Sequence, residues 1–344
     1  MRAAGGLPRC GRRALLAAAG LGGLGCGSAI LGRPAAGQAL PPALLPDSTT
    51  LLLPGPENGA AAQWARNVAA GLARALPQAM ALRTSILGGP DGVTAANRFA
   101  TLEGGDGRTL LVLPGLAAHA RLVGESRAQF QPANWLPLCA SWQGAVLAGR
   151  GLPAPASARP LRLALPGPEA PETAALMALD LTGHAAAPLF GLSGAAAEAA
   201  ITRGEADAMV IAAPHPRRRA LELGLTPWAE LETPERRDSP DLPSLLPPAL
   251  PATPQQLAVQ AGFAALRLRA ALVLPGLTSA DIVATWRRAA LRWQEEEGRQ
   301  SLEWAGPALV GAELRAAIGT LLPPPEAVLA YREWLLRRLS WQPG

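Results

Sequence analysis

The fold of this chain is set by one stretch near its start, Thr49-Thr50-Leu51-Leu52-Leu53-Pro54-Gly55-Pro56-Glu57-Asn58-Gly59. Its three leucines form an apolar run without alternation, which is typical of a strand buried on both faces of a parallel sheet. The Pro- and Gly-containing half interrupts regular structure, and Trp64, Val68 and Leu72 then recur at helical spacing. The stretch therefore predicts a strand, a loop and a helix. The loop is either a plain connection or an anion site made by free N–H groups at the helix N-terminus.

The same alternation continues along the chain. The expected strands after residues 51–53 are 109–113, 145–148, 161–165 and 208–212, and the expected helices are 60–76, 93–102, 172–181 and 193–203. Residues 240–254 are rich in Pro and are expected to be irregular, and the remainder is expected to be helical with Trp-rich faces. In the last helix Val328, Tyr331, Leu335 and Leu339 form one apolar stripe. Alternating strands and helices predict an α/β fold with helices on both faces of a parallel sheet.

Length and charge limit the function. A chain of 344 residues is long enough for two domains. All 31 basic residues are Arg, and five of them lie in residues 1–39, which contain no acid. The 26 that remain equal the 26 acidic residues, so the body of the protein is formally neutral. A neutral body argues against nucleic acid as a partner, because phosphate binding needs a positive surface.

Residues 1–39 have the parts of an export signal. Arg12 and Arg13 precede an apolar segment, and Gly37 and Ala39 suit cleavage before Leu40. The arginine pair also resembles a twin-arginine signal. Two alternatives stay open: a lipid attached to Cys26, or residues 14–31 as an uncleaved membrane anchor. Each of them predicts a protein outside the cytoplasm, and cleavage predicts a periplasmic one.

Cysteine usage is compatible with export. Once the leader with its two cysteines is removed, Cys139 is the single cysteine left, so no internal disulfide can form. Cys139 lies in the apolar run 135–140, which predicts a buried, unreactive thiol rather than a nucleophile.

Four short strings in a fixed order carry a family resemblance. They are Pro54 with Gly59, the string Gly105-Asp106-Gly107-Arg108-Thr109-Leu110-Leu111, the string Arg203-Gly204-Glu205-Ala206-Asp207, and Arg237-Asp238-Ser239-Pro240-Asp241-Leu242-Pro243-Ser244. With the order of the elements, they resemble the substrate-binding subunits of tripartite tricarboxylate transporters, the Bug family of periplasmic solute receptors. The resemblance runs from about residue 49 to the C-terminus.

The resemblance implies a type II periplasmic-binding-protein fold, with two α/β lobes joined by crossing strands. Residues 46–142 and 256–344 would form lobe 1, and residues 143–255 lobe 2. A small organic solute would be captured between the lobes and delivered to membrane permease subunits. The protein would be a monomer without a cofactor or a metal. The residues implied to contact the solute are Gly55, Glu57, Asn58, Gly59, Ala60, Gly88, Gly89, Pro114 and Gly115 in lobe 1, and Gly167, Glu169, Ser193 and Gly194 in lobe 2.

The departures from the family concern the ligand loops. Family members hold a carboxylate with small hydroxyl and amide donors, whereas residues 166–172 contain three Pro, Glu169 and Glu172, and residues 190–194 lack the family's Tyr and Lys. Proline has no N–H to donate, and a carboxylate repels an anion at close range. These loops therefore predict a neutral or cationic solute. In the first loop, backbone N–H groups at residues 58–60 are expected to bind, with Gly59 in an unusual φ.

Two other functional classes are weighed against solute transport. A receptor-like protein that has lost its solute and acts through protein partners has the same sequence signals. An enzyme is the third class, but the sequence has no nucleophile elbow, Walker loop or dinucleotide fingerprint. The three His residues show no metal spacing, and His215, between two prolines, is expected to be an exposed loop residue.

Overall fold

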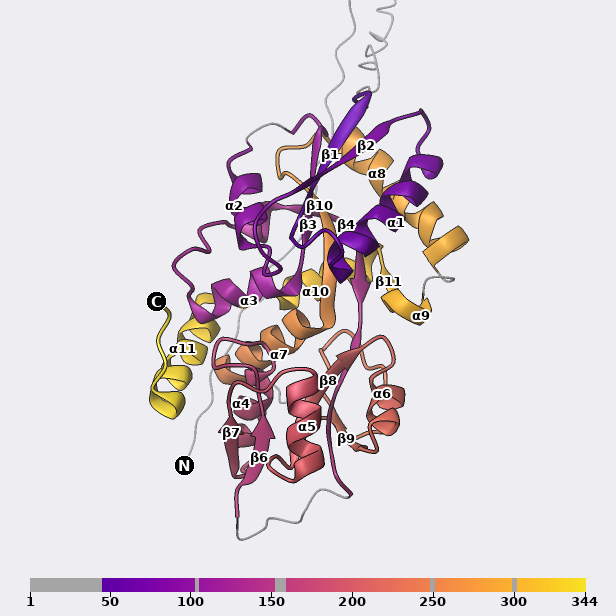
Figure 1. Ribbon diagram of the computed structural model, residues 1–344. Helices are drawn as coiled ribbons and strands as arrows, with labels where there is room; N and C mark the ends of the chain where they lie inside the picture. Colours follow the sequence, from indigo (N-terminus) through magenta and orange to yellow (C-terminus); the bar gives the residue numbers. More distant parts are fainter. Residues whose placement is uncertain (1–44, 103–104, 152–158, 248–250, 299–301) are drawn as a thin grey trace, which may run out of the picture. The chain divides into compact units, whose positions relative to one another are not determined.

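The computed structural model describes residues 45–344 apart from 103–104, 152–158, 248–250 and 299–301 (Figure 1). The export signal with Arg12, Arg13 and the cleavage site before Leu40 lies outside the described residues, so it stays a prediction. All described elements belong to one compact unit, Pro42–Gly344. Within the described residues, no helix is both long and apolar enough to cross a membrane.

The first sheet has six strands in the order β11-β4-β10-β3-β1-β2. The strands are β1 (Ser48–Leu53), β2 (Ala81–Ile86), β3 (Thr109–Leu113), β4 (Leu136–Trp142), β10 (Leu268–Leu274) and β11 (Ala308–Leu309). Strand β1 is parallel to both β2 and β3, whereas β10 is antiparallel to β3 and β4. The carboxyl ends of β1, β2 and β3 therefore lie at one edge of the sheet.

The second sheet has five strands in the order β7-β6-β8-β5-β9. The strands are β5 (Gly144–Gly149), β6 (Leu161–Ala164), β7 (Ala186–Leu189), β8 (Ala208–Ala213) and β9 (Thr226–Glu230). Strand β6 is parallel to β7 and β8, and β5 is antiparallel to β8 and β9. Both sheets are thus mixed, with parallel and antiparallel pairs of strands.

The helices connect these strands (Figure 1). They are α1 (Ala60–Ala75), α2 (Val93–Ala100), α3 (Gly115–Val123), α4 (Thr173–Leu181), α5 (Ala195–Arg203), α6 (Pro216–Glu222), α7 (Pro254–Arg267), α8 (Ala280–Trp293), α9 (Leu302–Ala305), α10 (Gly311–Thr320) and α11 (Pro325–Leu339). Two short helical segments add to these, η1 (Pro132–Asn134) and η2 (Gln294–Gly298). The α/β class predicted from the sequence is confirmed.

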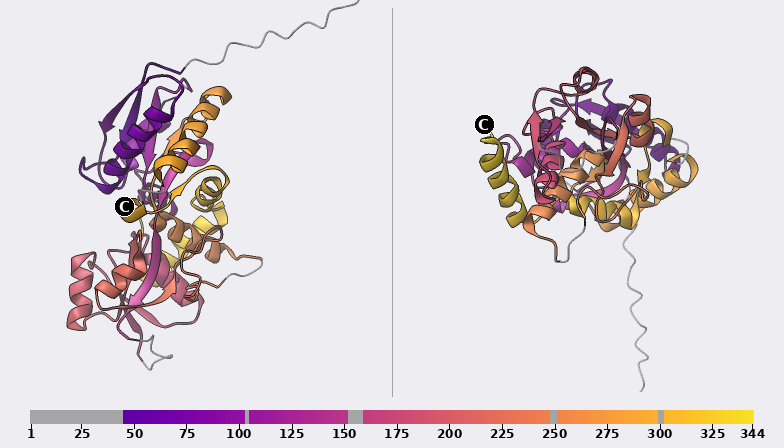
Figure 2. Two further views of the ribbon diagram at one scale, coloured as in Figure 1. Left: turned by 90° about the vertical axis from the view of Figure 1, so that its right-hand side faces the viewer. Right: turned by 90° about the horizontal axis from the view of Figure 1, so that it is seen from below.

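Helices cover both faces of the first sheet, as the apolar run of β1 predicts. Leu51 and Leu53 pack into one cluster with Trp286, while Leu52 between them packs into another with Phe99. Side chains alternate along a strand, so a run of three leucines reaches both faces. Figure 2 shows α1 in indigo beside α8 in orange, and these two helices cover the first of these faces.

The chain passes from one sheet to the other without a break. Gln143 is the single residue between β4 and β5. Its backbone N–H donates to the Arg267 carbonyl at 2.9 Å, and its side-chain amide donates to the Leu266 carbonyl at 2.8 Å. The return passage through α7 and β10 is therefore bonded to the outward passage through β4 and β5. These are crossing strands of the kind that the resemblance implies.

One expectation about the C-terminal part is wrong. Residues 268–274 were expected to be helical with the rest of this region, but they form β10, the strand between β3 and β4. Its last five residues, from Ala270 on, are all buried, because the strand lies inside the sheet with helices on both faces. A continuous apolar run of this length fits a buried strand as well as a buried helix, and the partner strands decide between them.

Helices α3, α4, α7 and α11 share one hydrophobic cluster, which includes Leu122, Ala175, Phe263 and Tyr331. The predicted stripe on the last helix is confirmed, since Tyr331 and Leu335 are buried and Val328 and Leu339 pack against the same cluster. This cluster joins helices that follow strands of both sheets. The two sheets are therefore held together by a core as well as by the crossing strands.

A close approach of α7 to α4 gives a test of this core. A Cβ on Gly262 in α7 would lie 2.4 Å from the Ala174 Cβ, so Gly262→Ala forces the two helices apart. Better helix propensity would recover roughly 1 kcal/mol, but overpacking of a core costs about 1–3 kcal/mol. We expect a net loss of up to about 2 kcal/mol in the free energy of unfolding, measured by urea denaturation.

The matched control is Gly319→Ala in α10, where nothing lies within 4 Å of an added Cβ. It should be neutral or stabilising by up to about 1 kcal/mol. Equal effects of the two substitutions would contradict the packing argument.

Candidate functional site

The loops that follow β1, β2 and β3 pack against one another. A Cβ on Gly55 would lie 2.5 Å from the Gly88 carbonyl oxygen, and a Cβ on Gly92 would lie 2.5 Å from the Pro114 ring. Gly88 and Gly92 have φ of 73° and 74°, a region that favours glycine. The structure therefore brings together Gly55, Gly88 and Pro114 from the predicted lobe 1 site. Gly89 lies in the same loop and is exposed.

The first loop uses its polar groups internally. Glu57, Asn58 and Ala60 are exposed. The carbonyl of Glu57 accepts a hydrogen bond of 2.8 Å from Arg66, and the N–H of Gly59 donates to the Pro56 carbonyl at 2.9 Å. The expected unusual φ at Gly59 is wrong, because its φ is −66° as helix N-cap residues commonly have.

Gly115 has a packing role that the sequence did not indicate. A Cβ there would lie 1.9 Å from the Ala265 carbonyl oxygen of α7. Pro114 and Gly115 are both buried, at the N-cap and the first residue of α3. The glycine therefore permits the contact between α3 and α7.

In the second sheet, the loops after β6 and β7 are hydrogen-bonded to each other. The N–H of Gly191 donates to the Pro166 carbonyl, and the N–H of Leu192 donates to the Leu165 carbonyl, both at 3.0 Å. Gly167 is buried and its carbonyl accepts a 2.7 Å bond from the Thr173 hydroxyl. The predicted lobe 2 residues Gly167, Glu169, Ser193 and Gly194 thus belong to one group of loops. Glu169, Ser193 and Gly194 are exposed within it.

His119 links the two groups of loops. It lies in α3, one turn after Leu116, and the backbone of Ala170 and Glu169 lies close to its ring. The His119 ring meets the Tyr331 ring edge-on at 5.9 Å between centroids. Both His119 ring nitrogens and the Tyr331 hydroxyl are buried without a hydrogen-bond partner among the described residues. Helix α3, which follows β3, therefore contacts the loop that follows β6.

Burial shifts the pKa values of His119, Glu172 and Tyr331. It lowers the pKa of His119 from 6.5 to about 4, an effect that the nearby backbone partly offsets. Burial also raises the pKa of the half-buried Glu172, at the N-cap of α4. The pKa of Tyr331 is raised by burial and by the Glu172 carboxylate. At neutral pH His119 and Tyr331 are therefore both uncharged.

Arg267 is the residue that the sequence reasoning missed. Its side chain is fully buried where α7 ends and β10 begins. It donates to the Leu231 carbonyl at 3.0 Å, lies 3.7 Å from the Glu230 carboxylate, and pairs with Asp238. Its guanidinium also lies over the Trp142 ring, 5.5 Å from the centroid. A lone arginine in the apolar run 263–268 was the available signal, because arginine is rarely buried unless it is paired.

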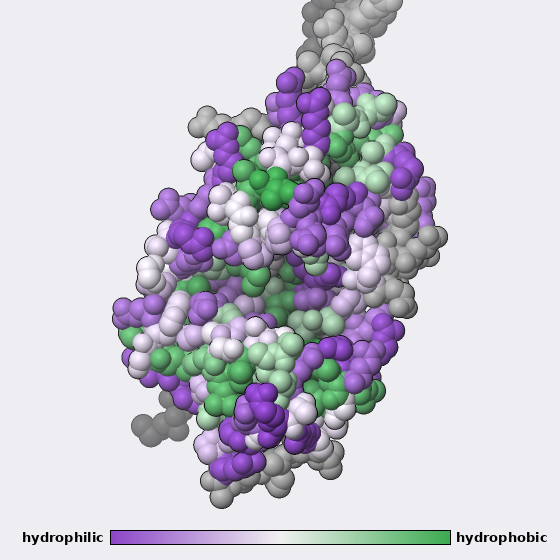
Figure 3. Space-filling view, in the orientation of Figure 1, coloured by the Kyte–Doolittle hydropathy of each residue, from purple (hydrophilic) through white to green (hydrophobic). Residues whose placement is uncertain are grey.

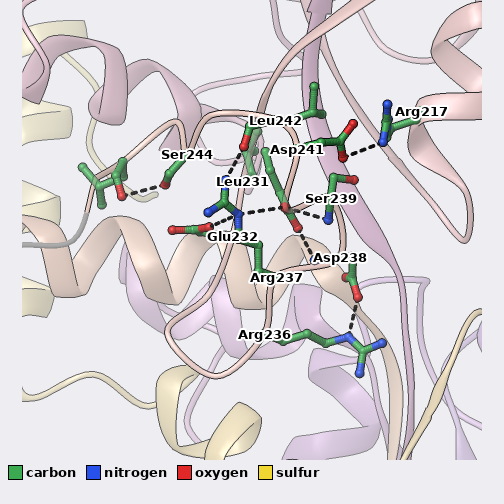
Figure 4. Close-up of polar contacts among 12 residues, drawn as sticks. Arg217, Leu231, Glu232, Arg236, Arg237, Asp238, Ser239, Asp241, Leu242 and Ser244 are labelled. Atoms are coloured by element: carbon green, nitrogen blue, oxygen red, sulfur yellow. Dashed lines mark hydrogen bonds and ion pairs between the residues drawn. The ribbon is translucent and has the colours of Figure 1, made fainter.

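The string 237–244, singled out by the resemblance, bonds to one of these carboxylates. Figure 4 shows polar contacts of this segment, among them that of Arg236 with Asp238. The Glu230 carboxylate accepts backbone bonds from Asp238 at 2.6 Å and Ser239 at 2.9 Å. Arg236 bonds to Asp238 at 2.6 Å. This segment therefore joins β9 and the end of α7 at the passage between the two sheets.

Other candidates for chemistry are not supported by their surroundings. His215 is half-buried with an unpartnered, buried Nε2, so its expected exposure is wrong; Pro216 beside it packs close to Gly144. Cys139 is buried as predicted, and burial raises the pKa of its thiol. Among the described residues, no three His, Cys, Asp or Glu side chains are grouped to hold a metal ion.

Comparison with solved structures identifies the architecture. A TctC solute-binding protein from Polaromonas, without ligand, superposes with a TM-score of 0.64 at 15% identity, covering 85% of this chain and 98% of that one. This chain has the two-lobe fold of periplasmic solute-binding proteins. The sequence alone matches no protein-family model and no curated protein.

Two related structures hold small ligands. Rpa4515 from R. palustris, with adipate, has a TM-score of 0.53 at 17% identity and covers 86% of this chain and 98% of that one. MatC from Rhodopseudomonas palustris, with malate, has a TM-score of 0.50 at 20% identity. The match covers 85% of this chain and 100% of the MatC chain. BugD, a periplasmic binding protein, also has this fold. The similar structures are binding proteins rather than enzymes.

Removing the buried charge of Arg267 should be severely destabilising. Arg267→Met keeps the length of the side chain but removes the buried cation beside Glu230, which then keeps only the exposed Arg237 at 3.8 Å among the described residues. Loss of one partner of a buried ion pair costs about 3–5 kcal/mol. Glu230→Gln in the same protein should recover part of that loss, because the uncompensated charge is gone. Urea denaturation of both proteins measures the difference.

The control is Arg269→Met, two residues further along β10, whose half-buried side chain donates to the Trp304 carbonyl. A smaller loss of about 1 kcal/mol is expected there. An equal loss at both positions, or no recovery in the double variant, would contradict the assignment of Arg267 as a compensated buried ion.

His119 should make stability depend on pH. Its pKa is 6.5 when unfolded and about 4 when folded, so the unfolded state binds more protons between these values. The contribution to stability is complete above pH 6.5 and is lost as the pH falls towards 4, by about 3 kcal/mol in total. His119→Phe should remove this pH dependence of stability, measured as the difference from wild type in urea midpoints between pH 4 and 7.

The control is His184→Asn, at an exposed position, which should leave the pH dependence of stability unchanged. Parallel stability–pH curves for wild type and His119→Phe would refute the prediction.

Proposed function

We propose that this protein captures a small organic solute between its two lobes and delivers it to a membrane permease. The observation that carries the proposal is the meeting of loops from the carboxyl ends of parallel strands in both sheets. In open α/β sheets, ligands bind outside these strand ends. The contact between His119 in α3 and the backbone at residues 169–170 joins the two groups of loops at one place.

The ends of both sheets contribute to the proposed site. Gly55, Gly88 and Pro114 pack together on the first sheet, and residues 166–167 and 191–194 do so on the second. We take residues 46–142 with 256–344 as lobe 1 and residues 143–255 as lobe 2, so that the passages at Gln143 and α7 connect them. Closure about these passages would enclose a solute, as hinge-closing binding proteins do.

The cellular setting of this proposal is outside the cytoplasm. The leader over residues 1–39 supports export to the periplasm, and the fold is that of proteins described as periplasmic. Delivery to permease subunits and action as a monomer belong to the same proposal. Residues 166–172 and 190–194 lack the hydroxyl and amide donors with which family members hold a carboxylate. This loss supports a second candidate function, a receptor-like protein that binds no solute.

Solute-induced closure gives a direct test. Spin labels on Leu277→Cys and Leu221→Cys, in proteins with Cys10 and Cys26 changed to Ser, report the distance between the sheets. Leu277 and Leu221 are 80% and 67% exposed, and Cys139 is buried and should not react with the label. A library of small metabolites is first screened by thermal shift, because a ligand at one hundred times its Kd stabilises by about 2.7 kcal/mol. A stabilising solute should also narrow and shorten the distance distribution.

The outcomes separate the two functions. A solute that stabilises the protein and changes the distance supports transport. Stabilisation without any change in distance would place the ligand elsewhere. No stabilising compound and one unchanged distance distribution throughout the library would favour the receptor-like alternative.

A further inference from the structure

Large apolar side chains are exposed at the loops of the proposed site. Ile86 at the end of β2, Leu116 in the first turn of α3 and Phe190 after β7 are 38%, 42% and 39% exposed. They come from the carboxyl ends of strands in both sheets. Figure 3 shows a hollow across the middle of this face of the unit, with apolar residues in and around it. Exposed apolar side chains on loops beside a hollow are candidates for ligand contact.

Several backbone donors of these loops are used within them. The N–H groups of Gly59, Gly92 and Ala170 donate to the carbonyls of residues 56, 89 and 167 at 2.9, 3.2 and 3.1 Å. Those of Gly191 and Leu192 donate to residues 166 and 165. The prolines of the loops have no N–H to offer. A carboxylate needs several such donors, and these five are engaged within the loops.

The guanidinium groups near these loops have partners of their own. Arg66 donates to the Glu57 carbonyl at 2.8 Å. Arg127 pairs with Asp91 at 3.0 Å and with Glu125, so its charge is compensated by the loop after β2. Arg217, which follows His215, pairs with Asp241 at 2.7 Å. These cations are therefore not preorganised for an anionic solute.

The carboxylates of Glu57 and Glu169, by contrast, form no ion pair among the described residues. Both side chains are exposed at the loops, one in each group. An unpaired carboxylate beside apolar side chains attracts an ammonium group and repels an anion. Next to Glu169 lies the buried His119 ring, which the backbone of residues 169 and 170 approaches.

We propose that the solute of this site has an apolar body and a neutral or positively charged polar group, and is not a carboxylate. The inference rests on the proposed solute-binding function. Ile86, Leu116 and Phe190 would contact the apolar body, and Glu169 would receive the polar or cationic group. The site would thus differ in ligand class from the similar structures that hold adipate and malate.

A series with one carbon skeleton tests the charge preference. Binding of hexylammonium, hexan-1-ol, hexanoate and adipate to the full exported protein is measured by calorimetric titration at constant ionic strength. Hexylammonium and hexan-1-ol should bind at least tenfold more tightly than hexanoate and adipate. Either carboxylate binding as tightly as hexylammonium would overturn the inference.

Two variants assign the roles of the side chains. Glu169→Gln should weaken hexylammonium binding about tenfold and leave hexan-1-ol unchanged, since it removes a charge at constant shape. Phe190→Ala should weaken both about fivefold, because it removes apolar contact. The controls are Asp47→Asn and Leu277→Ala, an exposed carboxylate and an exposed leucine at the opposite edge of the first sheet. If a control variant weakens binding as much as the corresponding site variant does, the assigned roles of Glu169 and Phe190 are overturned.

Failure of this inference is distinguishable from failure of the proposed function. If no member of the series binds, the hits of the metabolite library decide. A stabilising hit that is a di- or tricarboxylate overturns the inference and leaves solute capture intact, whereas a neutral or cationic amphipathic hit supports it. No hit and no change in the spin-label distance would end both.

Discussion

The arrangement of the two sheets depends on the ion pairs and hydrogen bonds of one fully buried guanidinium, that of Arg267. A buried charge is expensive unless its field is compensated, and here the Glu230 and Asp238 carboxylates, three backbone carbonyls and the Trp142 ring all face it. These groups come from β4 and the residue after it, from the end of β9 and from the segment that follows β9. The charge can therefore be satisfied only when β4, β9, the segment after β9 and the end of α7 are all in place.

The hydrophobic core also connects the two sheets, through a larger number of residues than the Arg267 site. Helices that follow strands of both sheets share one apolar cluster, and α11 closes it with Tyr331. Helix α11 also reaches both sides with polar contacts: Arg332 donates to the Leu122 carbonyl in α3, and Arg338 donates to the Ala186 carbonyl in β7. Any movement of the lobes must keep these contacts or exchange them. The last helix is thus part of the connection between lobes, in addition to the lobe 1 assignment that the resemblance implied.

The loops at the proposed site show how a fold can be kept while its ligand chemistry changes. Their glycines and prolines maintain the turns, and several of their backbone N–H groups are bonded within the loops. The exposed side chains of these loops include apolar and acidic ones, such as Phe190 and Glu169. Fold and specificity depend on different atoms of the same loop, so structural similarity at 15–20% identity carries the architecture and not the ligand.

The sequence by itself determined the α/β class, the βα unit at residues 49–76, the buried state of Cys139 and the apolar stripe of the last helix. These follow from local period and composition, which depend on near neighbours in the chain. It also pointed to residues 237–244, though not to what they surround.

Tertiary structure alone decided that residues 268–274 are a strand, that Gly115 serves packing against α7, and that Arg267 is a buried ion. Each of these depends on groups many residues away: the β3 and β4 ladders, the Ala265 carbonyl, and the Glu230 and Asp238 carboxylates. A short apolar run, a glycine or an arginine has several stable environments. Only the long-range contacts, which have no signature in local spacing, select one of them.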